Sequence, residues 1–138
     1  MKLKEFFIPG EPARVTAQQR RIGPRLKSGR YAVYMSPKIA EARAELLQYL
    51  RAEAPDEPWA IPVALRVMWW FGTDDMDKAY TSKTTRPDLD NLEKMLLDCM
   101  TESGFWRDDA LVVMKTTGKL WAPREEAGIE ISLSSYGG

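Results

Sequence analysis

Three aspartates and one lysine carry the chemistry that this sequence is expected to perform. They fall in the segment 86–113, which reads RPDLDNLEKMLLDCMTESGFWRDDALVV. Asp88 and Asp90 stand two positions apart, and Asp109 follows later in the same segment. Carboxylate oxygens are the ligands that hard divalent cations prefer, and carboxylates that converge repel one another unless a cation lies between them. The set predicts a Mg²⁺ site, and Lys94 is suited to donate to a phosphate beside it.

The absence of histidine and the single cysteine limit the catalytic mechanisms that this chain can use. The sequence has no histidine and one cysteine, Cys99. This excludes Ser-His-Asp and Cys-His mechanisms, imidazole general bases and zinc sites built from histidine and cysteine. A single cysteine forms no disulfide within the chain, and Cys99 falls on the apolar stripe of a predicted helix, where we expect a small buried hydrophobe. Any catalysis must therefore use oxygen ligands, lysine, tyrosine or hydroxyl groups.

Structural roles compete with these assignments. Asp90, with Glu93 three residues later, matches an acidic N-cap with a back-bonding glutamate, and Asp88 could favour the helix dipole. Lys94 could be a solvated lysine that pairs with Asp90 or Asp98 on the helix surface. However, an N-cap needs only one acidic residue. Capping therefore explains neither the pair Asp88 and Asp90 nor the later Asp109. We therefore favour the metal site.

The helix at 91–103 must position these groups. A proline precedes Asp88, so we expect extended backbone there, and alternate extended residues point the same way, which lets Asp88 and Asp90 face one site. A helix of about 13 residues is roughly 20 Å long. Residues 105–109, if extended, return over about 16 Å. Asp109 then either closes the site tightly within one chain or is supplied by a partner subunit.

Charge is unevenly distributed along the chain. The formal net charge is zero, yet residues 1–31 carry eight Lys and Arg against two Glu, which gives +6 and leaves −6 for the remainder. A basic segment beside an acidic body suits a protein that binds nucleic-acid phosphates, although a solvated basic loop is the alternative. The predicted DNA-contacting residues are the basic ones of this segment and of the loop before the second helix: Arg14, Arg20, Arg21, Arg25, Lys27, Arg30, Lys83 and Arg86.

Hydrophobic periodicity and capping signals predict the remaining elements. Strands are expected at 3–8, 31–34, 62–71, 111–117 and 128–134, and helices from Ser36-Pro37 to about 53–55 and over 91–103. The basic stretch 11–30 and the polar stretch 72–87 are expected to be loops. Phe105 and Trp106 are expected in the core, with insertion into nucleic acid as the alternative.

These elements predict one fold class and one domain. Their order indicates an α/β (α+β) fold, a small mixed β-sheet packed against two helices, in a single domain over residues 1–138. No apolar run approaches the ~20 residues that span a membrane, and the N-terminus lacks a signal-peptide pattern, so we expect a cytoplasmic protein with no membrane association.

The segment 86–113 resembles the signature of the RusA family of Holliday junction resolvases. In that signature R-P-D-L-D-N-L-x-K is followed by a helix and then by G-F-W-x-D-D-x-x-V. The resemblance places Asp88, Asp90 and Asp109 on the family's three essential aspartates and Lys94 on its essential lysine. The N-terminal region departs from the family's P-x-P-x-x-R pattern and keeps only Pro12 and Arg14, which leaves the DNA contacts open.

The resemblance implies a function. It implies a RusA-like homodimeric crossover junction endodeoxyribonuclease that resolves four-way (Holliday) DNA junctions by paired phosphodiester hydrolysis in recombination and repair. Mg²⁺ would be the cofactor, and Mn²⁺ would substitute for it. Two rival functions stay open: another carboxylate-metal nuclease that acts on flap or branched DNA, and a non-catalytic junction-binding module.

Overall fold

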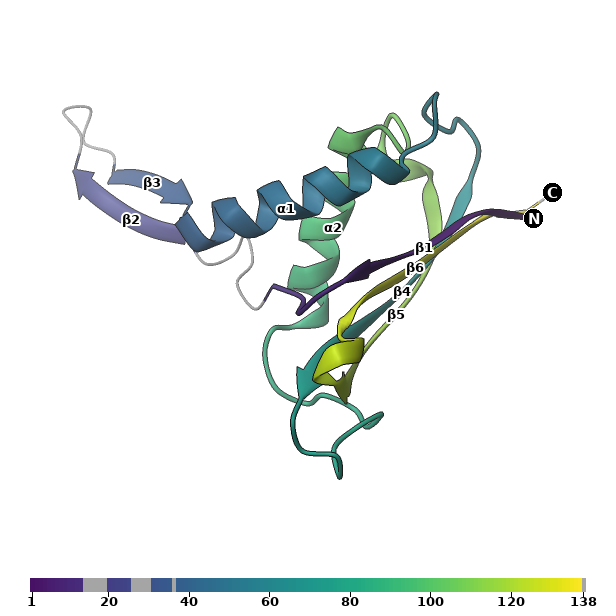
Figure 1. Ribbon diagram of the computed structural model, residues 1–138. Coiled ribbons are helices and arrows are strands. Elements are labelled where there is room, and N and C mark those ends of the chain that lie inside the picture. Colours follow the sequence, from purple (N-terminus) through teal and green to yellow (C-terminus); the bar gives the residue numbers. More distant parts are fainter. Residues whose placement is uncertain (14–19, 26–30, 36, 138) are drawn as a thin grey trace.

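The computed structural model describes residues 1–13, 20–25, 31–35 and 37–137 (Figure 1). Its strands are β1 Lys2–Pro9, β2 Arg20–Arg25, β3 Tyr31–Met35, β4 Val63–Thr73, β5 Val112–Pro123 and β6 Gly128–Ser135. Its helices are α1 Pro37–Glu53, α2 Leu89–Ser103, and the short 3-10 turns η1 Asp109–Leu111 and η2 Arg124–Glu126.

Four strands form one mixed sheet in the order β1-β6-β4-β5. β4 pairs antiparallel with β6 and parallel with β5, and β1 pairs antiparallel with β6. Alternate residues of β4, such as Val63, Leu65 and Val67, are buried because a strand turns successive side chains to opposite faces. α2 connects β4 to β5, which is the crossover that parallel neighbours require.

Both long helices cover the same face of this sheet (Figure 1). α1 buries Leu46 and Leu50 toward the sheet, and the ion pair of Arg43 with Glu102 joins α1 to α2. The mixed sheet with two helices confirms the predicted fold class. Phe105 and Trp106 are 0% and 1% exposed, which confirms that they belong to the core.

The hairpin of β2 and β3 corrects one prediction. Residues 20–25 were expected in a loop but form a strand that pairs antiparallel with β3, with Ile22 opposite Val33. Charged residues, a glycine and a proline interrupt the apolar alternation of β2, so periodicity could not reveal it. The hairpin lies beyond the start of α1, away from the four-stranded sheet (Figure 1).

The helix that carries the candidate site begins earlier than predicted. α2 starts at Leu89, and Asp88 is its N-cap with extended backbone at φ −75° and ψ 146°. At the other end, Gly104 has φ 92° and its N–H donates to the carbonyls of Met100 and Thr101. Because a positive φ suits glycine, Gly104 ends the helix as expected.

Within the described part of the chain, no helix combines the length and apolar character needed to cross a bilayer.

Candidate functional site

Asp88 and Asp90 lie together at the N-terminus of α2, and both are exposed. Asp88 is the N-cap but makes no side-chain capping hydrogen bond, and one carboxylate oxygen of Asp90 accepts from the N–H of Asn91 at 3.0 Å. The capping-box alternative is wrong, because Asp90 is not the N-cap and the Glu93 carboxylate pairs with Lys115 at 3.1 Å. The expected extended arrangement is also wrong for Asp90, which lies in the first helical turn.

Lys94 lies one turn after Asp90 on the same helix and is exposed, as predicted. Among the ion pairs of the described residues, none involves Lys94. The alternative that Lys94 pairs with Asp90 or Asp98 therefore finds no support. Side chains of an α-helix lean toward its N-terminus, and in α2 this is the end where both carboxylates lie.

Asp109 lies at the opposite end of α2. It opens η1, while the side chain of Asp108 caps that turn by accepting from the N–H of Ala110 at 2.9 Å. The chain does not return along α2, because Trp106 pairs with Trp59 near the start of β4 and residues 109–111 form a 3-10 turn. The expected extended return over 105–109 is therefore wrong.

This topology separates the three carboxylates within one chain. α2 has 15 residues and is about 22 Å long, with Asp88 at its start and Asp109 beyond its end. No three acidic, histidine or cysteine side chains of the described residues are grouped closely enough to hold a metal ion. The exposed carboxylates suit a hard cation by chemistry, yet one chain by itself does not assemble the full set.

Two lysines hold the backbone that leads into Asp88. The Nζ of Lys83 donates to the carbonyls of Thr85 and Arg86 at 3.2 and 2.6 Å, and the Nζ of Lys119 donates to the carbonyls of Thr85 and Pro87 at 2.7 Å each. Residues 85–87 are thus fixed from both sides. We call Lys83 and Lys119 the lysine clamp.

The clamp corrects the prediction that Lys83 contacts DNA. Lys83 is 2% exposed, and its ammonium lies 4.7 Å from the Trp121 ring centroid and 5.1 Å from that of Phe71. A side chain so buried does not reach a phosphate on the surface. Sequence reasoning missed Lys119 altogether, because nothing in the local pattern of a strand lysine relates it to a loop more than thirty positions earlier.

The other predicted DNA contacts remain predictions. Arg86 is exposed and lies two residues before Asp88. β2 contains Arg20, Arg21 and Arg25. The residues Arg14, Lys27 and Arg30 lie outside the described residues.

A family model and several named proteins are similar to this chain. The family model described as Endodeoxyribonuclease RusA matches residues 9–134. The chain is 27% identical over 112 residues to a protein of Enterobacteria phage 82, with 80% of this chain and 83% of that protein aligned. It is 33% identical over 72 residues to a protein of Lactococcus phage r1t (52% and 55% aligned) and over 79 residues to one of Escherichia coli K12 (56% and 56%).

All three relatives carry the name crossover junction endodeoxyribonuclease RusA. The aligned region spans about half the length of the phage r1t and Escherichia coli proteins. The family match covers nearly the whole chain and includes the segment on which the resemblance was based. The chain therefore belongs to the endodeoxyribonuclease RusA family.

Proposed function

We propose that this chain is a divalent-metal-dependent endodeoxyribonuclease that resolves four-way DNA junctions as a homodimer. The observation that carries the proposal is the arrangement of the signature residues: Asp88, Asp90 and Lys94 gather at one end of α2, and Asp109 lies at the other. Family membership and the names of the relatives supply the reaction. A junction resolvase acts on chromosomal or phage DNA, so we place the protein in the cytoplasm.

Each active site takes residues from both subunits. Asp88 and Asp90 of one subunit and Asp109 of the partner subunit would hold Mg²⁺, or Mn²⁺ in its place. The bound cation would act as a Lewis acid that polarises the phosphodiester, and it would make a bound water easier to deprotonate. Lys94 donates to the phosphoryl oxygens and offsets the negative charge that grows in the transition state. The lysine clamp keeps Asp88 at a fixed place relative to α2.

The dimer matches its substrate by symmetry. A four-way junction has a two-fold axis and needs two matched cuts, and a two-fold dimer presents two identical sites related in the same way. Arg86, beside each site, and the basic residues of each hairpin would contact phosphates, which fix the orientation of the protein and carry no base sequence information. The enzyme then recognises the shape of the junction.

Mixing two inactive variants tests this arrangement. Asp90→Asn and Asp109→Asn homodimers should each fail to cut a Mg²⁺-supplemented four-way junction. After subunit exchange, half of the dimers carry one variant of each kind. A shared site then restores one intact centre per mixed dimer, or roughly a quarter of the wild-type number of centres. If the mixture stays inactive while both variants still bind the junction and exchange subunits, the shared site is wrong.

Substrate comparison separates the rival functions. Incision of a synthetic four-way junction, a flap and a linear duplex of the same sequence is measured in Mg²⁺. We expect paired cuts in the junction and little incision of the linear duplex. Preferred cutting of the flap would favour a different branched-DNA nuclease, and binding without cutting by the wild-type chain would favour a non-catalytic module.

A further inference from the structure

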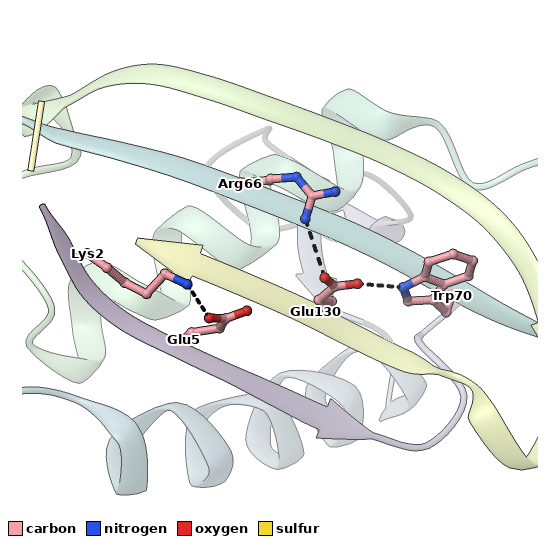
Figure 2. A network of polar contacts seen from close by, with 5 residues as sticks. All are labelled: Lys2, Glu5, Arg66, Trp70 and Glu130. Atoms are coloured by element: carbon pink, nitrogen blue, oxygen red, sulfur yellow. Dashed lines mark hydrogen bonds and ion pairs between the residues drawn. The ribbon is translucent and has the colours of Figure 1, made fainter. Parts of the chain in front are cut away.

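The six arginines in residues 37–137 divide into two groups by their partners. Four of them form ion pairs with carboxylates: Arg43 and Arg51 with Glu102, Arg66 with Glu130, and Arg124 with Asp74. Figure 2 shows the pair of Arg66 with Glu130, at 3.3 Å, on the open face of the sheet. The other two, Arg86 and Arg107, are exposed, and neither forms an ion pair with a carboxylate of the described residues.

Each of these two unpaired arginines lies two residues before a carboxylate of the proposed metal site. Arg86 precedes Asp88, and Arg107 precedes Asp109. Arg86 was a predicted DNA contact, whereas Arg107 was not, because it follows α2 and lies in neither of the two basic stretches. An unpaired guanidinium group thus accompanies the proposed site residues at both ends of α2.

The core holds the backbone on the N-terminal side of Arg107. Trp106 is 1% exposed, and its indole N–H donates to the hydroxyl of Thr101 at 2.8 Å. The carbonyl of Phe105, which is fully buried, accepts from the N–H of Trp59 at 2.9 Å. Arg107 is therefore the first exposed residue after an anchored pair of aromatic residues.

Asp108 holds the backbone on the other side of Arg107. Its carboxylate accepts from the N–H of Ala110 at 2.9 Å, and its carbonyl accepts from the N–H of Leu111 at 3.1 Å. The acidic neighbour of Arg107 thus caps a turn and does not neutralise the guanidinium. A side chain on a backbone that is fixed from both sides loses less freedom when it binds a ligand.

The charge of the proposed site calls for a cation beside Asp109. Three aspartates carry more negative charge than one Mg²⁺ neutralises, so the loaded site would still repel a phosphodiester. Lys94 and Arg86 offset this excess at the end of α2 where Asp88 lies. Arg107 offsets it beside Asp109, and a guanidinium suits the task because it binds two oxygens of one phosphate through parallel hydrogen bonds.

We propose that Arg107 binds a backbone phosphate of the DNA next to the phosphodiester that is cut. The proposal rests on the proposed function, because it names a substrate contact of that same site, and it applies whichever subunit supplies Asp109. Asp109 binds the cation, and Arg107 holds the neighbouring phosphate, so the two residues together fix the strand relative to the cation. Arg107 is in this sense a substrate-binding residue.

The salt dependence of junction binding tests this contact. Full-length wild type and Arg107→Gln are compared in EDTA over a range of KCl concentrations, with a synthetic four-way junction as the probe. We expect Arg107→Gln to weaken binding about tenfold. The slope of log affinity against log salt should fall by about 0.9 for each phosphate contact that is lost. An unchanged affinity and slope would overturn the proposal.

Arg66→Gln is the matched control for that measurement. The Arg66 side chain is 52% exposed and lies on the face of the sheet that the helices leave open (Figures 1 and 2). This variant removes the same charge far from both ends of α2, so affinity and slope should match the wild type. Equal losses in the two variants would mean that total charge weakens binding, and this would contradict a contact made by Arg107.

A neutral phosphate analogue tests whether the contact is direct. Single methylphosphonates are placed at each position next to the cut, and each junction is tested with wild type and Arg107→Gln. At the contacted position the analogue should weaken wild-type binding but should weaken the variant no further, because the same interaction is already lost. Additive losses at every position would overturn the contact. Arg107→Lys should recover the salt slope but only part of the affinity, because an ammonium lacks the planar fork of a guanidinium.

Cleavage in Mg²⁺ separates this proposal from the proposed function. Arg107→Gln should need about tenfold more enzyme for half-maximal cleavage of a limiting junction, because it loses substrate binding. If wild type cuts the junction and Arg107→Gln binds and cuts equally well, the Arg107 contact is wrong and the nuclease function stands. If wild type binds without cutting while Arg107→Gln binds more weakly, the contact is supported and the function is contradicted.

Discussion

Asp90 and Asp98 are two exposed carboxylates of the same helix with different expected roles. Asp90 lies in the first turn beside Asp88, whereas Asp98 lies two turns further on. Replacing Asp90 with asparagine keeps the size of the side chain but removes the charge that binds a cation. We expect Asp90→Asn to lower junction cleavage by at least about a hundredfold and to leave junction binding nearly unchanged.

Asp98→Asn is the control for that measurement. It removes one negative charge from the same helix surface without touching the proposed site, so cleavage and binding should both match the wild type. Unaltered cleavage by Asp90→Asn would count against Asp90 as a metal ligand. Equal losses of cleavage in the two variants would instead indicate a general effect of the helix charge.

Cys99 gives a stability prediction that is independent of catalysis. Burial raises the pKa of its thiol from 9.0 to about 11. Between these values the unfolded chain loses the proton and the folded chain keeps it, so the stability present below pH 9 falls as the pH rises. The free energy of unfolding should drop by about 1 kcal/mol more in the wild type than in Cys99→Ala between pH 8 and pH 10. Denaturant titrations at both pH values measure this difference, and equal drops would show that the thiol does not titrate this way.

At the scale of single elements, the lysine clamp holds the segment that leads into α2. Lys119 donates to two carbonyls of residues 85–87, and the loss of both charged hydrogen bonds would let this segment and Asp88 move. Lys119→Met should raise the Mg²⁺ concentration for half-maximal cleavage about tenfold, because groups that orient metal ligands typically affect affinity by that much. Junction affinity should change little.

Lys78→Met is the matched control for the clamp. Lys78 is exposed, and its ammonium lies 5.7 Å from the centroid of the Trp121 ring that Lys83 also contacts. This variant removes the same charge and should leave the Mg²⁺ requirement unchanged. A similar shift in both variants would mean that total charge, and not the position of residues 85–87, sets the metal requirement.

The elements that the sequence predicted well are those whose apolar residues repeat at regular spacing. β4 alternates cleanly, and α2 repeats its apolar residues at helical spacing up to Gly104, so both could be located from side-chain pattern alone. β2 could not, because Arg20, Arg21, Gly23, Pro24 and Arg25 leave no regular alternation of apolar residues in its sequence. The prediction that residues 105–109 return in extended form along α2 was wrong because Trp106 pairs with Trp59. This contact joins distant parts of the chain, and no local sequence pattern indicates it.

At the scale of the whole molecule, the sequence predicted which residues are candidates for the site. It could not predict whether one subunit or two would bring them together. The identities of Asp88, Asp90, Lys94 and Asp109 follow from a local motif, whereas their separation follows from the parallel pairing of β4 with β5. The crossover between these parallel strands runs through α2, which leaves Asp88 and Asp90 at one end of the helix and Asp109 beyond the other. Spacing along the chain could not decide between one subunit and two.

A shared metal site couples cation binding to dimerisation. If Mg²⁺ needs carboxylates from two subunits, it binds the dimer and not the monomer, and mass action then requires that Mg²⁺ favour the dimer. We expect millimolar Mg²⁺ to lower the dissociation constant of the wild-type dimer, by about tenfold if the coupling is near 1.4 kcal/mol. Sedimentation velocity over a dilution series, with Mg²⁺ and with EDTA, measures the shift without any DNA present. Asp109→Asn should dimerise as the wild type does in EDTA, because no cation then bridges the subunits, but should lose the response to Mg²⁺. Asp98→Asn should keep it. A Mg²⁺ effect of equal size in Asp109→Asn would mean that the cation acts on the dimer elsewhere, and the division of the site between two subunits would then have to be abandoned.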